Sequence, residues 1–396
     1  MDTRVVGQAQ QVGLHRLENF LAQDPGNQSL QVAVFEAALR CSDWDKARAR
    51  IDAGLRSQAD ALAWRIREGD LLLAQKSYAE ARDALLAIDL DGLPSAASDA
   101  IVHNVAYTHF GEGNFAQTIA ALEPRMSEQL QGADQLESVL PPSAELQKLW
   151  MRALHHSGDV ERAFGWAKAA DESGGLSVRA AGVASLVALD ATEAEFAKKW
   201  ARACIEEDIN DFEKAEAFVT WSTLLLGNQD IRGAREFADR ALALNDREGR
   251  AWSVIGFAQL LAEALTDAQV TFARALESIP DHVGTWHGLG WAQLAAGSHE
   301  AALATFQRAL ALDRNFAESH GAVAVALIYM GHRQAASEHV DRAQGLDKTS
   351  LSGHYARALL NGEVRDQQTL QRLAKRLLAG REGPSGGTMD DWLRKP

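Results

Sequence analysis

The sequence predicts an all-α protein: an α-solenoid, wound as a right-handed superhelix, of about nine helix-turn-helix repeats with helical caps. The first observation is self-similarity, because residues 280–309 repeat the spacing found about 34 residues earlier. The second is a small residue that returns once per repeat. The third is composition, since 8 prolines and few β-branched runs favour helix. The recurring pairs are Trp252 and Trp286, Gly256 and Gly290, Ala268 and Ala302, and Phe272 and Phe306.

These pairs resemble the W-x2-L-G…A-x3-F…A…P pattern of the tetratricopeptide repeat (TPR) family. The pattern begins at Trp286 and, one repeat earlier, at Trp252. The resemblance implies a stack of helix pairs in which the first helix of each pair lines a concave face. It also implies that positions 2, 5, 9 and 12 of each repeat point into that face.

Residues 1–27 are predicted to form an N-terminal capping helix, because Leu14, Leu17, Phe20 and Leu21 share one helical face. TPR repeats 1–3 are predicted at 28–132 and TPR repeats 4–9 at 144–350. The nine windows of about 34 residues begin at residues 28, 62, 99, 144, 178, 215, 249, 283 and 317.

The second helix of each window carries one small residue, and eight of the nine are alanine. A small residue at a fixed period predicts that two helix backbones approach closely. The residue four places on lies on the same face and should fill the space between helices. The small positions are Ala47, Ala81, Thr118, Ala163, Ala197, Ala234, Ala268, Ala302 and Ala336. The residues four places on are Ile51, Leu85, Leu122, Ala167, Ala201, Ala238, Phe272, Phe306 and Val340.

A matching apolar row runs through the first helices, and Glu68 interrupts it. Turns before the second helices are predicted where glycine precedes a polar residue. These pairs are Gly113-Asn114, Gly158-Asp159, Gly227-Asn228 and Gly297-Ser298.

The repeat frame slips near 96–98, near 212–214 and, at greatest length, over the Pro-containing insertion 133–143. Two interpretations of this insertion stay open. It is either a lengthened helix followed by a loop, because Pro141-Pro142 stops a helix, or a break that divides the array into two lobes.

Residues 351–380 are predicted to form C-terminal capping helices, and 381–396 a flexible tail. The second of these helices has a leucine side and a basic side, so it is either a solubilising cap or a surface for an acidic partner or a membrane. In the tail, Trp392-Leu393 is either a docking motif or a pair that packs on the last helix.

Composition argues against several classes of protein. The formal net charge of -14 argues against direct nucleic-acid binding, and no run of about 18 apolar residues is present to span a membrane. The two cysteines, Cys41 and Cys204, form no CxxC motif, and Cys204 falls on a packing position where a buried thiol is expected. The start lacks a signal-peptide core, so a cytoplasmic protein is expected.

No motif for catalysis appears, so no enzyme, cofactor or metal site is expected. P-loop, G-x-S-x-G, H-E-x-x-H and dinucleotide-binding patterns are all missing from the sequence. His155 and His156 are adjacent, and adjacent side chains on a helix point about 100° apart, which is poor for a shared metal ion.

The resemblance instead implies a groove that binds a peptide or protein. One section of it is cationic, which suits a carboxylate, and another is aromatic, which gives a large contact area. The predicted groove residues are His103, Tyr107, Phe110, Lys148, Arg152, His155, Arg179, Arg250, Phe257, His287, Trp291, Tyr329 and Tyr355. Lys148, Arg152 and Arg179 match the two-carboxylate clamp of chaperone-binding TPR modules only loosely, so that specificity is not expected.

The sequence therefore predicts a non-catalytic scaffold or adaptor that binds a protein or peptide in its concave groove. Two alternatives stay open. One is a chaperone or assembly factor for a bacterial secretion, pilus or envelope system, which rests on analogy with the fold. The other is a self-associating structural protein, and therefore a homo-oligomer.

Overall fold

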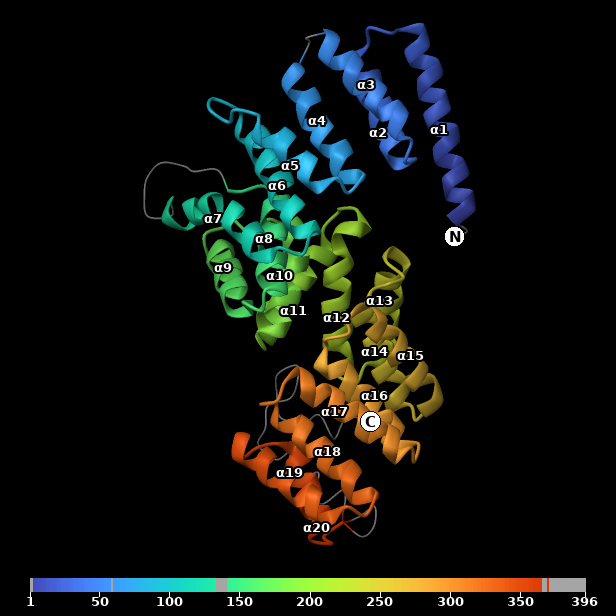
Figure 1. Ribbon diagram of the computed structural model, residues 1–396, viewed down its shortest axis with the longest axis vertical. Helices are drawn as coiled ribbons and strands as arrows, with labels where there is room; N and C mark the ends of the chain where they lie inside the picture. The colour runs from blue at the N-terminus through green and yellow to red at the C-terminus, as the bar shows by residue number, and fades with distance from the viewer. Residues whose placement is uncertain (1–2, 58–59, 133–140, 365–368, 370–396) are drawn as a thin grey trace. The chain divides into compact units, whose positions relative to one another are not determined.

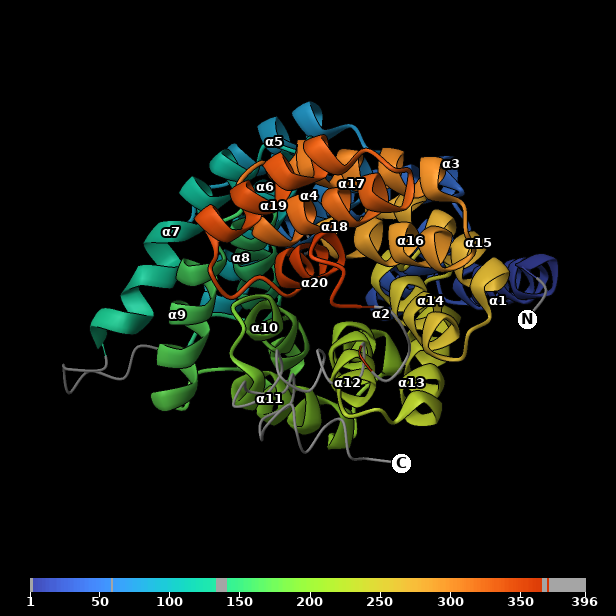
Figure 2. The ribbon, with the colours of Figure 1, turned by 90° about the horizontal axis from the view of Figure 1, so that it is seen from below.

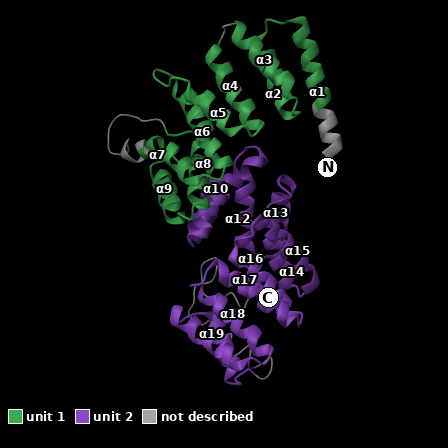
Figure 3. Ribbon diagram, in the orientation of Figure 1, with its two compact units in different colours: residues 1–180 green, residues 181–396 purple. Residues whose placement is uncertain are grey.

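The computed structural model describes residues 3–57, 60–132, 141–364 and 369. Over these residues the chain forms twenty α-helices and one short 3-10 helix, η1, and contains no strand (Figure 1). The predicted all-α fold is therefore confirmed. The chain divides into two compact units, Met1–Ala180 and Ala181–Pro396 (Figure 3), and each is described by itself.

Unit 1 consists of a first helix followed by helix pairs, and α10 continues from it into unit 2. Its helices are α1 (Thr3–Gln23), α2 (Gln28–Arg40), α3 (Trp44–Ser57), α4 (Ala61–Ala74), α5 (Tyr78–Leu86), α6 (Ser95–Gly111), α7 (Phe115–Gly132), α8 (Ala144–His156), α9 (Val160–Glu172) and α10 (Val178–Asp190). The helix α1 falls within the segment predicted as a cap. Two of its apolar face residues, Leu14 and Leu21, are buried, whereas Phe20 is exposed, with the Arg16 guanidinium over its ring.

Unit 2 continues the pattern of paired helices. Its helices are α11 (Ala194–Glu206), η1 (Asp211–Lys214), α12 (Ala215–Gly227), α13 (Ile231–Leu244), α14 (Gly249–Leu261), α15 (Leu265–Ser278), α16 (Val283–Ala295), α17 (His299–Leu312), α18 (Ala317–Tyr329), α19 (Arg333–Leu346) and α20 (Leu351–Leu360). The helix η1 lies where the repeat frame slips. In Figure 2, α14, α16 and α18 lie on the inner side of the curve of unit 2, and α15 and α17 lie on its outer side. Each of these first helices also contacts the next first helix directly.

The predicted row of small residues is confirmed by burial. All nine small positions, from Ala47 to Ala336, have no exposed surface, and neither do the nine residues four places on. A larger side chain at any small position would have to displace a neighbouring helix. The recurrent alanine therefore sets the spacing between helices in both units.

The turn between the two helices of each window has one conformation throughout. Counting from the start of each window, position 15 has a positive φ in all nine. It is glycine in four windows, at 113, 158, 297 and 331. In the other five it is Ser42, Lys76, Thr192, Gln229 or Glu263, with φ of 55 to 63°. One predicted turn was misplaced: Gly227 ends α12, and Gln229 is the left-handed residue.

Four successive first helices share a second anchor. At position 4, a ring N–H donates to the backbone carbonyl six residues earlier. The four bonds are Trp252 Nε1 to Asp246 at 2.8 Å, Trp286 Nε1 to Pro280 at 2.7 Å, His320 Nε2 to Arg314 at 3.2 Å and His354 Nε2 to Lys348 at 2.8 Å. Each bond ties the start of a first helix to the loop that precedes it.

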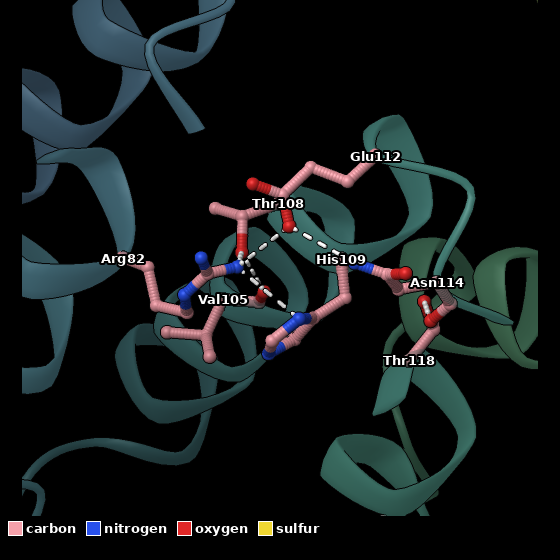
Figure 4. Close-up of polar contacts among 7 residues, drawn as sticks. All are labelled: Arg82, Val105, Thr108, His109, Glu112, Asn114 and Thr118. Atoms are coloured by element: carbon pink, nitrogen blue, oxygen red, sulfur yellow. Dashed lines mark hydrogen bonds and ion pairs between the residues drawn. The ribbon is translucent and has the colours of Figure 1, made fainter. Parts of the chain in front are cut away.

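In unit 1, arginines join neighbouring repeats. The Arg48 guanidinium on α3 forms an ion pair with Glu68 on α4, which explains the carboxylate in the apolar row. Figure 4 shows the next junction, where Arg82 on α5 donates to Thr108 Oγ1 and His109 Nδ1, both at 3.1 Å, and to Glu112 Oε2 at 3.2 Å. Burial first, and then the Arg82 charge, lower the pKa of His109. Its ring is therefore neutral and accepts from the guanidinium.

In unit 2, glycines let helices approach aromatic rings or backbone. A Cβ on Gly290 would lie 2.4 Å from the Phe306 ring, and one on Gly288 would lie 2.5 Å from the Phe272 ring. A Cβ on Gly321 would meet the backbone nitrogen of Gly353 at 2.4 Å. Side chains are therefore excluded from these positions.

Other expectations fall partly outside the described residues. The predictions for 133–140, for most of the second C-terminal helix and for the tail lie there, so the alternatives for these segments stay open. The expected burial of Cys204 is confirmed, and burial raises the pKa of its thiol to about 11. None of the described helices is long and apolar enough to cross a membrane.

Candidate protein-binding surface

An aromatic row on α6 contains three predicted groove residues. The rings of His103 and Tyr107 stack with centroids 6.0 Å apart, and those of Tyr107 and Phe110 with centroids 6.2 Å apart. The residues lie at positions 5, 9 and 12 of their window, so they follow one face of the helix. Tyr107 is 40% exposed, which makes this face accessible to a partner.

Two residues that the sequence analysis missed extend the α6 row. Phe115, the first residue of α7, lies 5.4 Å from Phe110, and His156, the last residue of α8, lies 5.5 Å from Phe110. Phe115 and His156 stack on each other at 5.1 Å with an interplanar angle of 16°. We call the five residues His103, Tyr107, Phe110, Phe115 and His156 the aromatic row.

The Phe115–His156 contact recurs in unit 2. It joins position 17 of one window to position 13 of the next. At the corresponding positions of unit 2, His299 stacks on Tyr329 at 5.2 Å with an angle of 27°. In unit 1, Tyr78 at position 17 lies against Gly111 at position 13, where a Cβ would meet its ring at 2.4 Å. A comparison of positions 13 and 17 in all windows, looking for aromatic residues, would have identified Phe115 and His156 from the sequence.

At the junction of α11 and α12, position 17 is Ala194 and a hollow replaces the ring. It has a volume of about 90 Å³. Its lining residues are Ala194, Glu195, Lys198, Trp221, Leu224, Leu225 and Asn228. The lining is therefore mostly apolar, with the charged residues Glu195 and Lys198. Four other windows carry a ring at position 17: Trp44, Tyr78, Phe115 and His299.

A hydrogen-bonded chain orients His103. Its Nδ1 donates to Asn104 Oδ1 at 3.0 Å, and Asn104 Nδ2 donates to Asp70 Oδ1 at 2.7 Å. Burial raises the pKa of Asp70, and the hydrogen bond from Asn104 opposes that shift. In the neutral ring, this hydrogen bond places the proton of His103 on Nδ1 and leaves Nε2 as the acceptor.

The predicted cationic section has a mixed environment. Lys148 is buried, and its ammonium lies 2.7 Å from Glu145 Oε1 on the same helix. Arg152 and His155 on α8 are half-buried, while Arg179 near the start of α10 is exposed. A carboxylate therefore already balances the Lys148 charge, and the section is less cationic than its sequence indicates.

Arg250 takes part in an internal ion pair. Its two terminal nitrogens bind the two Asp190 oxygens at 2.8 and 2.6 Å, which joins α14 to the end of α10. A bidentate pair of this kind holds both groups in a fixed geometry. The guanidinium is thus occupied within the chain.

Phe257 and His287 make internal packing contacts. The Phe257 ring meets Phe272 edge-on at 4.9 Å. His287 Nε2 hydrogen-bonds Ser319 Oγ at 2.8 Å, with its ring against Phe306 and Phe316. Burial lowers the pKa of His287 to about 4, so the ring is neutral near pH 7.

Tyr329 on α18 and Tyr355 on α20 form a second aromatic surface, and Trp291 on α16 packs on the same buried cluster as Tyr355. Trp291 packs on the Phe306 ring at 5.2 Å. The hydroxyls of Tyr329 and Tyr355 are 3.3 Å apart, and Tyr329 is 48% exposed. Burial, and then the Tyr329 hydrogen bond, raise the pKa of the Tyr355 phenol. The structure thus brings two sets of predicted residues together, one in each unit.

Comparison with known proteins identifies the repeats. Residues 35–97 and 265–317 match the tetratricopeptide repeat family, one segment in each unit. The chain therefore contains tetratricopeptide repeats. The matched segments contain the buried small positions and left-handed turns that recur in all nine windows. No curated protein matches the chain.

Several solved structures are similar to this chain. The APC/C hetero-tetramer Cut9-Hcn1 is 13% identical, with 93% of this chain and 82% of that chain covered and a TM-score of 0.44. MamA is 15% identical over 41% of this chain and 92% of that chain, with a TM-score of 0.34. YrrB, described as a TPR protein with an unusual peptide-binding site, is 15% identical over 58% of this chain and 95% of that chain, with a TM-score of 0.32.

Proposed function

We propose that this TPR protein is a non-catalytic scaffold or adaptor that holds a segment of a partner protein against its first helices. The exposed aromatic row on α6 to α8 carries this proposal. Aromatic side chains give a large contact area at a small cost in conformational entropy and are enriched where proteins bind each other. The 40% exposed ring of Tyr107 leaves that area accessible.

The second aromatic surface supports the same function in unit 2. Tyr329 is exposed and stacked on His299, so its ring is held in place before a partner arrives. The hollow beside Ala194 adds a site for one apolar side chain. Arg250, Phe257 and His287 serve internal contacts, so we propose for them a supporting part in shaping the surface.

Affinity capture from the native cell, followed by crosslinking, tests the proposal. The test variant combines Tyr107→Ala and Tyr329→Ala, and a second variant, Ala194→Phe, fills the hollow. Phe212→Ala is the matched control, because Phe212 is 69% exposed but lies on η1. We expect the double variant to lose a crosslinked partner that the control retains. Equal recovery of the same partners by folded double variant and control would refute the proposal.

The same capture experiment separates the alternatives. An exported subunit of a secretion, pilus or envelope system as the main partner would identify a chaperone or assembly factor. A second copy of this chain would identify a self-associating structural protein. Light scattering with and without residues 381–396 checks that last outcome, since equal monomer masses would exclude it.

A further inference from the structure

A hollow between α1 and α3 contains an arginine that the fold itself does not use. The hollow has a volume of about 300 Å³, within the size range of small-molecule sites. Its lining residues are Glu18, Leu21, Ala22, Pro25, Val34, Lys46, Ala49 and Arg50. None of them belongs to the candidate protein-binding surface, so this hollow is a separate feature of unit 1.

The floor of the hollow is apolar. Leu21 from α1 is 6% exposed and Val34 from α2 is 2% exposed, so both belong to the buried core of the unit. Ala22, Pro25 and Ala49 form short apolar walls around them. A ligand that enters the hollow therefore buries a hydrocarbon group against Leu21 and Val34.

The two cations at the hollow, Lys46 and Arg50, differ in their partners. Lys46 lies 3.0 Å from Glu18 Oε1 and 3.5 Å from Asp43 Oδ2, so two carboxylates offset its charge. Those contacts, with the hydrogen bond to Glu18 first, raise the pKa of Lys46. Arg50 is half-buried, and among the described residues it has no hydrogen bond or ion pair. One cation of the hollow is thus available to an anion.

Arg50 also occupies a position where other repeats carry packing residues. It lies at position 23 of its window. Of the eight equivalent residues, Trp166, Trp200, Thr271 and Thr305 are buried, at 2 to 8% exposure, and Ala84, Ala121, Phe237 and His339 are half-buried. A half-buried guanidinium loses part of its hydration at such a position, and an accompanying anion offsets that cost. The hollow beside Arg50 provides the space for that anion.

We propose that this hollow binds a small carboxylate carried on an apolar group, with the carboxylate on Arg50 and the apolar group on Leu21 and Val34. A guanidinium binds a carboxylate through two parallel N–H bonds, and a carboxylate is the anion that most readily carries a short hydrocarbon body. The volume limits that body to about the size of a leucine side chain or a six-carbon acid.

Ligand-observed saturation-transfer NMR on the full chain tests the proposal with N-acetyl-L-leucine, N-acetyl-L-leucinamide and hexanoate. We expect the acids to bind and the amide not to bind. Arg50→Gln should weaken acid binding by roughly tenfold or more, because it removes a charge-assisted contact. Arg56→Gln, an exposed arginine of the same helix outside the hollow, should leave binding unchanged. Ala49→Trp should block the hollow while keeping Arg50.

Each binding result either supports or overturns the proposed carboxylate site. Binding of both acids supports a free aliphatic acid as ligand, and binding of N-acetyl-L-leucine alone supports the carboxyl end of a peptide. Equal binding of acid and amide, unchanged binding in Arg50→Gln and Ala49→Trp, or no binding of either acid would overturn the proposal. Because the aromatic surfaces take no part, failure here leaves the proposed scaffold function unaffected.

Discussion

In unit 1, an arginine at position 21 of two successive windows reaches the first helix of the next repeat, as Arg48 and Arg82 do. In unit 2, glycines such as Gly288 and Gly321 bring a first helix directly against a ring or backbone of a neighbouring repeat. Yet both units share the buried small residue and the left-handed turn. The internal geometry of a repeat is therefore fixed, whereas the chemistry that joins one repeat to the next varies.

This difference predicts that the unit 2 junctions at Gly288 and Gly321 are sensitive to volume, while the unit 1 junctions at Arg48 and Arg82 are sensitive to salt. A close approach of backbones cannot relax around an added methyl group, because the interior is densely packed. A partly exposed ion pair contributes little and is screened by ions.

The largest effect is expected from Gly321→Ala. Its Cβ would meet backbone atoms of Ser352 and Gly353, and backbone cannot move aside as a side chain can. We expect a loss of about 3 kcal/mol in the free energy of unfolding, at the upper end for overpacking. Gly345→Ala on α19 is the control, because no atom lies within 4 Å of its added Cβ. Denaturant unfolding measures both, and similar stability of the two variants would contradict the proposed role of Gly321.

The next effect is on pH dependence, which we expect to be greatest in unit 2. Burial lowers the pKa of His282 and of His287 to about 4 each. The unfolded chain binds their protons more strongly, so stability present above about pH 6.5 is lost as the pH falls towards 4. His287→Gln should remove about 2 kcal/mol of this loss between those limits.

Melting temperatures of wild type and His287→Gln between pH 7 and pH 4.5 measure the difference. Carboxylates titrate alike in both proteins, so they cancel in the comparison. Parallel pH profiles would show that His287 does not contribute.

A smaller effect is expected at the Arg48–Glu68 pair of unit 1, whose side chains are 39% and 30% exposed. A double-mutant cycle with Arg48→Ala and Glu68→Ala should give a coupling energy of about 0.5 kcal/mol, and less in 1 M salt. A coupling energy that does not change in 1 M salt would show that the two side chains interact through packing and not through their charges.

The smallest effect tests what the two units share. Lys76→Gly in unit 1 and Glu263→Gly in unit 2 each replace a non-glycine residue with positive φ at the same turn position, which removes its backbone strain. We expect each to stabilise the protein by about 0.5 kcal/mol, since the relief of backbone strain exceeds the entropy that glycine adds to the unfolded chain. Thermal unfolding measures both. A gain in only one unit would show that the turns are not equivalent.

The fold could be predicted from the sequence because the burial of each packing residue depends on its position within its repeat. A fixed period places Ala47 and Ala336 in the same environment, so one pattern predicts the burial of both. It failed at Gln229, because a non-glycine residue in a left-handed turn leaves no signal in composition.

The candidate site was harder to predict because partners come from distant residues. Arg250 has the repeat position of a groove residue, but its carboxylate partner, Asp190, lies 60 residues away. His287 likewise bonds Ser319 in the next repeat. Phe115 and His156 were missed because their stacking joins two different helices across the segment 133–143.

The position-4 ring has a consequence for recognising such repeats. His320 and His354 make the same carbonyl bond as Trp252 and Trp286, so in these four helices the N–H donor is retained at that place while the ring changes from indole to imidazole. A sequence signature that demands tryptophan at position 4 would overlook the two repeats that carry His320 and His354 there, although the same anchor continues to residue 354.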